Sequence, residues 1–144
     1  MKENILISTG GSGGHVVPAQ TLYEHLKNEF NVFLTSDLRG SKFFEDNNKN
    51  FKIINVLPLT QNIFLLPWRI AIFFFSILKS FTYLKSKKIK TIISTGGYMS
   101  LPICISAKIL KLKIILFEPN LVLGRSNLFF LNYCSSILCY SEEI

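Results

Sequence analysis

The sequence has few of the residues that build disulfide frameworks or metal centres, since its 144 residues include three cysteines and two histidines. Cys104, Cys134 and Cys139 are odd in number, lack Cys-x-x-Cys spacing and lie in apolar surroundings. Such cysteines are typical of buried thiols in a reducing compartment. We therefore expect neither a disulfide framework nor a metal ion or other cofactor.

Long apolar runs are also missing. Pro67 and Arg69 interrupt the most apolar segment, 63–78, and the part clear of both is much shorter than the ~20 residues that cross a bilayer. The first residues lack the order of charged, apolar and small residues of a secretory signal, and Asn4–Ser8 begins a strand pattern at once. We therefore expect a cytosolic protein without a spanning helix.

Acidic residues are scarce: nine Asp and Glu face 16 Lys and Arg, which gives a net charge of +7. The chain is also 49% hydrophobic and contains 13 Phe. A basic and apolar chain suits an anionic membrane surface better than nucleic acid, whose binding faces are basic and polar or carry stacking aromatic residues. A general bias toward Lys, Asn, Ile and Phe is the alternative explanation.

Short β-branched runs alternate with helical patterns along the chain. Strands are expected at 5–7, 31–35, 52–56, 91–95, 114–117 and 136–140. Helices are expected at 17–29, 42–46, 67–85, 100–110 and 125–132. This alternation predicts one α/β domain over residues 1–144, a doubly wound parallel Rossmann-like sheet. Ligands of such sheets bind beyond the carboxyl ends of the strands, commonly between the first and fourth.

Two glycine loops of similar build are the most informative feature. Thr9-Gly-Gly-Ser-Gly-Gly-His15 follows the first expected strand, and Thr95-Gly-Gly-Tyr-Met-Ser-Leu-Pro102 follows the fourth. A glycine turn that leads directly into a helix leaves backbone N–H groups unpaired where the helix dipole favours negative charge. Two such turns side by side predict one anion site for a phosphorylated ligand large enough to contact both.

Neither loop matches the common nucleotide motifs. Starting at Gly11, the pattern G-x-G-x-x-G finds Gly13 but then Val16, and no Gly-Lys-Ser/Thr is present. The mismatch disfavours a nicotinamide- or flavin-binding domain. Asp37 lies near the expected place of a ribose-binding acid, but the polar stretch after it favours a solvated turn residue.

His15 is the candidate general base. It begins the first helix, beside the glycines, where the positive helix end would keep the imidazole neutral, as a base requires. A capping or packing role is the alternative. His25 has charged neighbours in mid-helix and is interpreted as a surface residue.

Further polar side chains follow the strands at the same edge of the sheet. Tyr98 and Ser100 offer hydroxyl groups in the second loop, with packing and capping as the alternatives. Glu118 and Asn120 flank Pro119 directly after the fifth strand. Ligand contact and capping of the next helix are both open for these two residues.

The helix expected at 67–85 is more apolar than one buried face requires. Its broad apolar face carries Trp68, Ala71, Ile72, Phe75, Leu78 and Phe81. Apolar residues surround its centre and cations lie around it, which predicts an interfacial helix on anionic lipid. The predicted membrane contacts are Trp68, Arg69, Phe73, Phe74, Lys87 and Lys88. Burial against a missing partner or domain is the alternative.

Three collinear motifs resemble the MurG family of glycosyltransferases. They are the two glycine loops and Glu118-Pro-Asn120, the last followed by Gly124 and Asn127. Members transfer N-acetylglucosamine from UDP-N-acetylglucosamine (UDP-GlcNAc) to undecaprenyl-pyrophosphoryl-muramyl-pentapeptide, which completes the peptidoglycan precursor lipid II. Their GT-B fold has an acceptor domain, a nucleotide-sugar domain and an active site between them. The resemblance implies that this chain is the acceptor domain, inactive without a donor domain.

The resemblance also implies roles for individual residues. His15 would remove the proton of the acceptor's C4 hydroxyl, and Asn120 would hydrogen-bond the N-acetylglucosamine. The acceptor's diphosphate would bind Gly10, Gly11, Gly13, Gly14, Gly96 and Gly97. The donor sugar would be bordered by Ser12, Gly13 and Gly14, and Tyr98 and Glu118 would be supporting residues. The reaction would invert the anomeric centre without a metal.

One motif departs from the family. The family usually has His-Glu-Gln-Asn where this chain has Phe117-Glu-Pro-Asn120, so we expect altered donor contacts there. The resemblance implies a peripheral protein on the cytoplasmic face of the bacterial inner membrane. A non-catalytic membrane-recruiting subunit that partners a separate donor-binding chain is the alternative.

Overall fold

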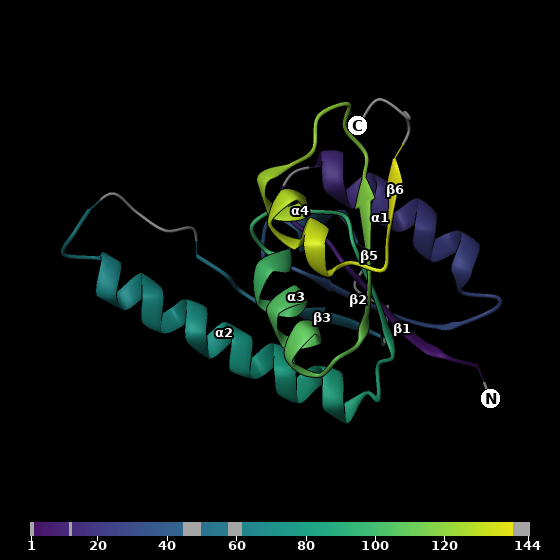
Figure 1. The fold of residues 1–144 in the computed structure, drawn as a ribbon, viewed down its shortest axis with the longest axis horizontal. Coiled ribbons are helices and arrows are strands. Elements are labelled where there is room, and N and C mark those ends of the chain that lie inside the picture. The colour runs from purple at the N-terminus through teal and green to yellow at the C-terminus, as the bar shows by residue number, and fades with distance from the viewer. Residues whose placement is uncertain (1, 12, 45–49, 58–61, 140–144) are drawn as a thin grey trace.

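A computed structural model describes residues 2–11, 13–44, 50–57 and 62–139. Its centre is one sheet of six parallel strands in the order β3-β2-β1-β4-β5-β6 (Figure 1). The strands are β1 (Asn4–Ser8), β2 (Asn31–Ser36), β3 (Phe51–Ile53), β4 (Thr91–Ser94), β5 (Lys113–Glu118) and β6 (Ser136–Cys139). The prediction of a doubly wound parallel sheet is confirmed, and β1 and β4 are the central neighbours at which the strand order reverses.

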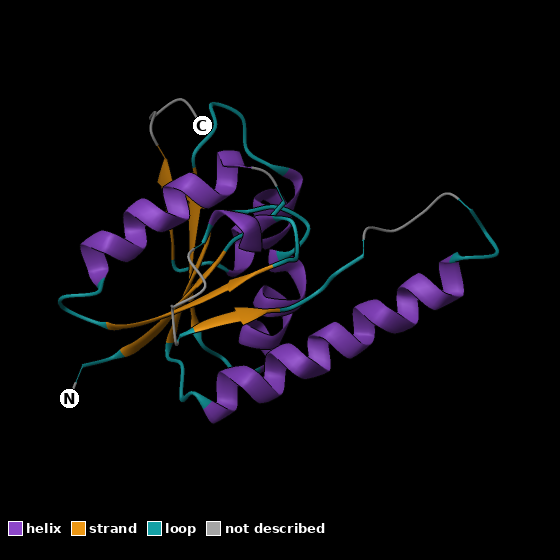
Figure 2. Ribbon diagram, turned by 180° about the vertical axis from the view of Figure 1, so that it is seen from behind, coloured by secondary structure: helices purple, strands orange, loops and turns teal. Residues whose placement is uncertain are grey.

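Helices cover both faces of the sheet (Figure 2). They are α1 (Gly13–Leu26), α2 (Leu66–Ser86), α3 (Ser100–Ile109) and α4 (Arg125–Phe130), with two 3₁₀ turns, η1 (Gly40–Phe43) and η2 (Leu131–Tyr133). The first helix begins at Gly13 rather than near Val17, so the glycines form its first turn. The short helix expected at 42–46 is η1, and residues 45–46 lie outside the described part of the chain.

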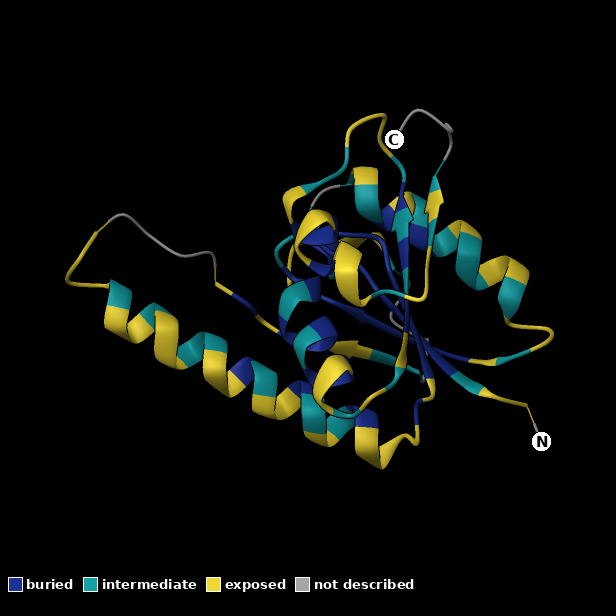
Figure 3. Ribbon diagram, in the orientation of Figure 1, coloured by how far each residue is buried: buried dark blue, intermediate teal, exposed yellow. Residues whose placement is uncertain are grey.

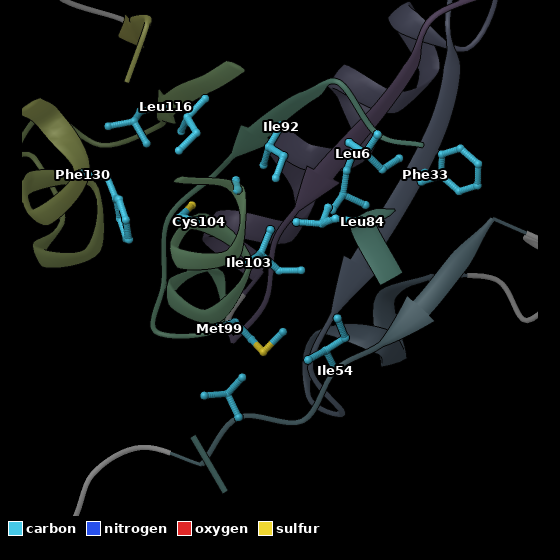
Figure 4. Close-up of a cluster of buried hydrophobic side chains, with 14 residues drawn as sticks. Leu6, Phe33, Ile54, Leu84, Ile92, Met99, Ile103, Cys104, Leu116 and Phe130 are labelled. Atoms are coloured by element: carbon cyan, nitrogen blue, oxygen red, sulfur yellow. The ribbon is translucent and has the colours of Figure 1, made fainter. Parts of the chain in front are cut away.

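Alternating strand residues build two hydrophobic layers because successive side chains of a strand point to opposite faces. Ile7 and Ile93 pack with residues of α1 on one face. Leu6 and Ile92 pack on the other face with Leu84 of α2 and with residues of α3 and α4 (Figure 4). Cys104 lies in this second layer, and burial raises the pKa of its thiol to about 12. Cys134 and Cys139 are only half-buried, so the expectation of buried thiols holds for Cys104 alone.

The face that α2 turns toward the protein is not its most apolar one. Its buried residues are Ser76, Ser80 and Leu84. Ser76 donates to the carbonyl of Asn55 at 2.9 Å, and Ser106 of α3 donates to the carbonyl of Ile77 at 2.9 Å. Small side chains allow α2 and α3 to pack closely, and the hydroxyl groups of Ser76, Ser80 and Ser106 that this packing buries are all hydrogen-bonded.

The apolar side of α2 therefore faces outward, and its N-terminal half projects beyond the sheet (Figures 1 and 3). Trp68, Phe74, Phe75 and Leu78 are all more than half exposed. The broad apolar face is thus largely an outer surface rather than a core contact. Over the residues described, none of the helices reaches the length and hydrophobicity that a membrane crossing demands.

Candidate functional site

The two glycine loops meet at the carboxyl ends of β1 and β4. The strands are hydrogen-bonded up to the loops, where Thr95 N donates to Ser8 O at 3.0 Å. A methyl group added at Gly97 would lie 3.4 Å from the carbonyl oxygen of Gly10. Gly11, Gly96 and Gly97 have φ of 83°, 87° and 81°, which strongly favour glycine. The predicted juxtaposition of the two loops is therefore present.

A pocket of about 330 Å³ opens between the loops. It is lined by Gly10, Gly11, His15, Asp37, Arg39, Val56, Gly97, Tyr98 and Met99. Glycine backbone, one imidazole and one guanidinium face this space. Ser12 lies outside the described residues.

The imidazole of His15 is held in one tautomer. Its Nδ1 lies 2.7 Å from the carbonyl oxygen of Thr95. A carbonyl oxygen only accepts, so Nδ1 carries the hydrogen and Nε2 of the neutral ring keeps its lone pair. His25 makes the same contact with Thr21 of its own helix, also at 2.7 Å, but it is exposed. Of the two histidines, only His15 lines the pocket.

Asp37 is not the solvated turn residue that the sequence suggested. It is 6% exposed and accepts hydrogen bonds from Gly11 N at 3.0 Å and Gly40 N at 2.8 Å. Burial alone would raise the pKa of Asp37, but these bonds and the nearby Arg39 outweigh it and hold the pKa below its ordinary value. Arg39 Nε is 3.4 Å from Asp37 Oδ2, and the Arg39 side chain is 74% exposed. The carboxylate fixes the first loop and places a cation at the pocket mouth.

These bonds correct the expected anion site. The N–H of Gly11 is already paired with Asp37, and the N–H of Gly96 donates to Ser94 Oγ at 3.2 Å. These two N–H groups are therefore not left for a ligand, whereas the N–H groups in the first turn of α1, which begins at Gly13 and Gly14, have no partner within the helix. The anion site therefore has fewer free backbone N–H groups than the two glycine loops suggested. Arg39 adds a positive charge to the pocket wall that was not predicted from the sequence.

Glu118 organises the loop after β5. It is fully buried, and its Oε1 accepts from the backbone N and Nδ2 of Asn120 at 3.2 and 2.8 Å. Its Oε2 accepts from Gly124 N at 2.8 Å and from Asn127 Nδ2 at 3.0 Å. Burial alone would raise the pKa of Glu118, but the four hydrogen bonds outweigh it and lower the pKa. Both oxygens are committed to the protein, so Glu118 supports Asn120 rather than contacting a ligand itself.

Asn127 connects this loop to the second glycine loop. A methyl group at Gly96 would lie 3.2 Å from Asn127 Nδ2 and 3.4 Å from His15 Cε1. Asn127 is 1% exposed, and its Oδ1 has no hydrogen-bond partner among the described residues. Its place beside His15 was not foreseen, because only the fold brings a residue of α4 to a loop after β4.

Tyr98 and Ser100 have different positions. Tyr98 lines the pocket, and its ring packs against that of Phe73 at 5.9 Å between centroids with the ring planes tilted by 42°. Ser100 is buried, donating to Gly97 O at 2.8 Å and lying 2.9 Å from Ser126 Oγ. Ser100 therefore stabilises the loop from the first turn of α3 but does not cap the helix, since Met99 is the capping residue. The ring of Tyr98 packs against Phe73, as the packing alternative proposed, and also lines the pocket.

The residues predicted to contact a membrane are not all on one surface. Trp68 and Phe74 are 66% and 65% exposed near the start of α2. Phe73 instead packs against the core and Tyr98, which corrects its assignment to the membrane surface. Lys87 and Lys88 follow the end of this 21-residue helix, so ~30 Å of helix separates them from its first turn. Arg69 is half-buried.

Within the described ranges, no three His, Cys, Asp or Glu side chains are grouped so that they could hold a metal ion. The hydrogen-bonding side chains that line the pocket are the imidazole of His15, the carboxylate of Asp37, the guanidinium of Arg39 and the phenol of Tyr98. They are suited to binding an anion and to moving a proton.

Comparisons with known proteins agree with this architecture. A sequence model of the glycosyltransferase family 28 N-terminal domain matches residues 5–139. Over all 144 residues the chain is 54% identical to a UDP-N-acetylglucosamine–N-acetylmuramyl-(pentapeptide) pyrophosphoryl-undecaprenol N-acetylglucosamine transferase of Pelagibacter ubique, covering 40% of that protein. A Prochlorococcus marinus transferase of the same name is 34% identical over 99% of this chain and is covered to 39%. The chain thus spans about two fifths of these curated relatives.

Solved structures show the same fold. The crystal structure of Acinetobacter baumannii MurG superposes with a TM-score of 0.84 at 20% identity, over 98% of this chain and 42% of that one. A putative UDP-N-acetylglucosamine 2-epimerase from Listeria monocytogenes superposes with a TM-score of 0.70 at 7% identity, over 99% of this chain and 40% of the other. At these identities the superpositions support the fold alone.

Proposed function

Because the chain belongs to the glycosyltransferase family 28 N-terminal domain family, we propose that it is the acceptor-binding domain of a transferase. That transferase moves N-acetylglucosamine from UDP-GlcNAc to undecaprenyl-pyrophosphoryl-muramyl-pentapeptide, the reaction named for its 54% identical relative. The observation that carries the proposal is the imidazole of His15 in the pocket between the two glycine loops.

His15 is the general base. Its Nδ1–H is committed to Thr95 O, so Nε2 accepts the proton of the acceptor's C4 hydroxyl. As that proton leaves, the hydroxyl oxygen bonds to the anomeric carbon of N-acetylglucosamine, and the bond from that carbon to the UDP oxygen breaks. Attack opposite the leaving group inverts the anomeric centre, and the imidazolium that forms is stabilised by its hydrogen bond to the Thr95 carbonyl.

The acceptor's diphosphate binds at the amino end of α1, where Gly13 and Gly14 present backbone N–H groups. Arg39 neutralises part of the added charge. It is needed because Asp37, ionised at neutral pH, is itself on the pocket wall. Because glycines have no side chains, phosphate oxygens can approach the backbone here closely.

Asn120 contacts the transferred sugar. Glu118 orients it by accepting both its backbone N–H and its Nδ2, which leaves the amide oxygen as the group for a sugar N–H or hydroxyl. Phe117 packs against the hydrophobic layer that contains Ile7 and Ile93, so the first position of this motif is structural here. Donor contacts in the loop then depend on Asn120.

Membrane docking belongs to the same proposal. The projecting half of α2 exposes Trp68, Phe74, Phe75 and Leu78, which suit the headgroup and acyl boundary of a bilayer. The chain's excess of Lys and Arg suits an anionic leaflet. A peripheral position on the cytoplasmic face of the bacterial inner membrane brings the pocket to a lipid-linked acceptor.

The test is a chimera in which this chain replaces the matching N-terminal part of the Pelagibacter ubique relative. Transfer of labelled N-acetylglucosamine from UDP-GlcNAc to a lipid-linked muramyl-pentapeptide is measured for the chimera and two variants. We expect His15→Ala to lower turnover by about 10²-fold or more, as for loss of a general base, with little change in acceptor affinity. His25→Ala is the matched control and should act like the parent chimera.

Equal turnover of the His15→Ala and parent chimeras would refute the base role. A folded chimera that binds the acceptor but never transfers the sugar would favour the alternative of a membrane-recruiting subunit.

A further inference from the structure

Asp37 is an unexpected residue in a pocket that is suited to anions. Its side chain lines the glycine-loop pocket together with Arg39, and its carboxyl group is ionised at neutral pH. A carboxylate on the wall of an anion site repels the ligand that the site is built to hold. Asp37 therefore needs a role in binding that outweighs this repulsion.

One oxygen of Asp37 is committed to the backbone. Oδ1 accepts from Gly11 N at 3.0 Å and from Gly40 N at 2.8 Å. A methyl group added at Gly10 or at Gly40 would lie 3.1 Å from this oxygen, so the backbone of both residues packs closely against it. Both lone pairs of Oδ1 are thus used, and the atom is enclosed by backbone. The part of the side chain that lines the pocket is therefore the other oxygen, Oδ2.

Oδ2 keeps the capacity to accept a hydrogen bond from a ligand. Its one hydrogen bond among the described residues comes from Arg39 Nε at 3.4 Å, and the Arg39 side chain is 74% exposed. This bond is weak, since charge-assisted hydrogen bonds are normally ~2.7–2.9 Å long. A methyl group at Gly11 would lie 3.9 Å from Arg39 Nη2, so the guanidinium lies beside the first glycine loop. An anion bound there can pair with the guanidinium and leave Oδ2 free to accept from the same ligand.

A ligand that satisfies both Asp37 and Arg39 must carry an anionic group and an N–H or O–H donor close to each other. The acceptor proposed above has this pairing. Its N-acetylmuramyl residue carries an acetamido group on the ring carbon next to the one that bears the diphosphate. The acetamido N–H is therefore the donor that lies nearest to the diphosphate.

We propose that Asp37 is a specificity residue for the acceptor, whose acetamido N–H donates to Asp37 Oδ2 while Arg39 pairs with the diphosphate. This role rests on the proposed function and assigns a residue that recognises the sugar next to the diphosphate. A diphosphate without a donor meets only the repulsion of the carboxylate, whereas the acceptor forms a charge-assisted hydrogen bond with it. The pocket therefore discriminates against inorganic pyrophosphate and bare prenyl diphosphates.

The variant Asp37→Asn tests Oδ2 selectively, because asparagine keeps one oxygen for Gly11 and Gly40 and replaces Oδ2 by an NH₂ group. Titration calorimetry measures how the full chain binds inorganic pyrophosphate and an acceptor with a short prenyl chain in place of undecaprenol. Asp37→Asn should weaken acceptor binding about tenfold or more, since a charge-assisted hydrogen bond is lost. It should tighten pyrophosphate binding about twofold or more, since a like charge is removed.

The matched control is Glu29→Gln, which removes the same charge at an exposed position and should change either affinity by less than about twofold. Circular dichroism establishes that both variants are folded. An acceptor analogue with hydrogen in place of the acetamido group tests the assigned donor, and it should bind Asp37→Asn at least as tightly as the parent chain.

The opposite signs expected for the two ligands separate the outcomes. Equal weakening of acceptor and pyrophosphate binding by Asp37→Asn would mean that Asp37 only holds the loop, and it would overturn the specificity role. Tighter binding of both ligands, or a tenfold loss with the analogue, would overturn it as well. Failure of the parent chain to bind the acceptor, with pyrophosphate binding intact, would overturn the proposed function and the role of Asp37 with it. Binding by the parent chain thus distinguishes the two failures.

Discussion

The buried carboxylate of Glu118 allows a quantitative test of the loop that positions Asn120. Glu118→Gln keeps the shape of the side chain but replaces one acceptor oxygen by an NH₂ group. Each oxygen of Glu118 receives two hydrogen bonds, so the new NH₂ group must face two donors. The less costly orientation turns it toward Asn120, which is exposed, rather than toward Gly124 and Asn127.

The backbone N–H and Nδ2 of Asn120 then both lose their acceptor, at ~0.5–1.5 kcal/mol each, and the charge-assisted bonds from Gly124 and Asn127 become neutral ones. We expect a loss of about 2–3 kcal/mol in the free energy of unfolding at pH 7. For a chain of this size that is a fall of roughly 6–9 °C in the melting temperature. Urea unfolding followed by circular dichroism measures it, with Glu29→Gln, at an exposed position, as the matched control that should change stability by less than about 0.5 kcal/mol.

The pH dependence gives a second readout. The pKa of Glu118 is lowered in the folded protein, so its contribution is complete above the ordinary value of 4.5 and is lost as the pH falls through the lower folded value. The stability difference between the parent chain and Glu118→Gln should therefore be constant near neutrality and shrink in the acid range below 4.5. A difference under about 0.5 kcal/mol at pH 7, or one that persists unchanged into that acid range, would refute the account of this loop.

Two further predictions concern the glycine-loop pocket. Gly97→Ala should lower the free energy of unfolding by about 1–3 kcal/mol, because a φ of 81° is strained for alanine and the new methyl group would contact Gly10 O. Gly13→Ala is the control, since its methyl group would make only ordinary contacts, and it should lower the free energy of unfolding far less. Equal urea midpoints for the two variants would contradict this prediction. Arg39→Gln should weaken binding of inorganic pyrophosphate by roughly tenfold in a calorimetric titration, because among the described residues Arg39 is the one Lys or Arg side chain on that pocket wall. The exposed Lys42→Gln should change the affinity little, and similar affinities for both variants would remove Arg39 from the site.

The sequence by itself determined the order of elements and the place of the site. Short apolar runs alternating with helical patterns are local signals, and the parallel sheet follows because strands joined by helical crossovers can hardly pair otherwise. The glycines at 11, 96 and 97 were readable in the same way, since a positive φ is a local demand of the backbone. His15 followed from its place directly after the first loop.

Only the tertiary structure decided which partners the polar residues have. Asp37 looked like a turn residue, and its role came from Gly11, which lies on another strand's loop. Glu118 was readable as a polar residue after a strand, but not as a buried carboxylate with four donors. Gly11 and Asp37 meet through the order of strands in the sheet, which no local pattern encodes. The donors to Glu118 lie within nine residues of it, and the folded path of the loop after β5 brings them to its carboxylate.

The orientation of α2 was likewise a tertiary outcome. Its periodicity identified a broad apolar face but did not predict whether that face packs against the protein or faces outward. A helix with apolar residues on nearly all sides has several faces that could pack. Close approach to α3 and hydrogen bonds for Ser76 and Ser106 selected the serine side as the inner one. The aromatic side of α2, with Phe75 beside Lys79, was thereby left facing outward.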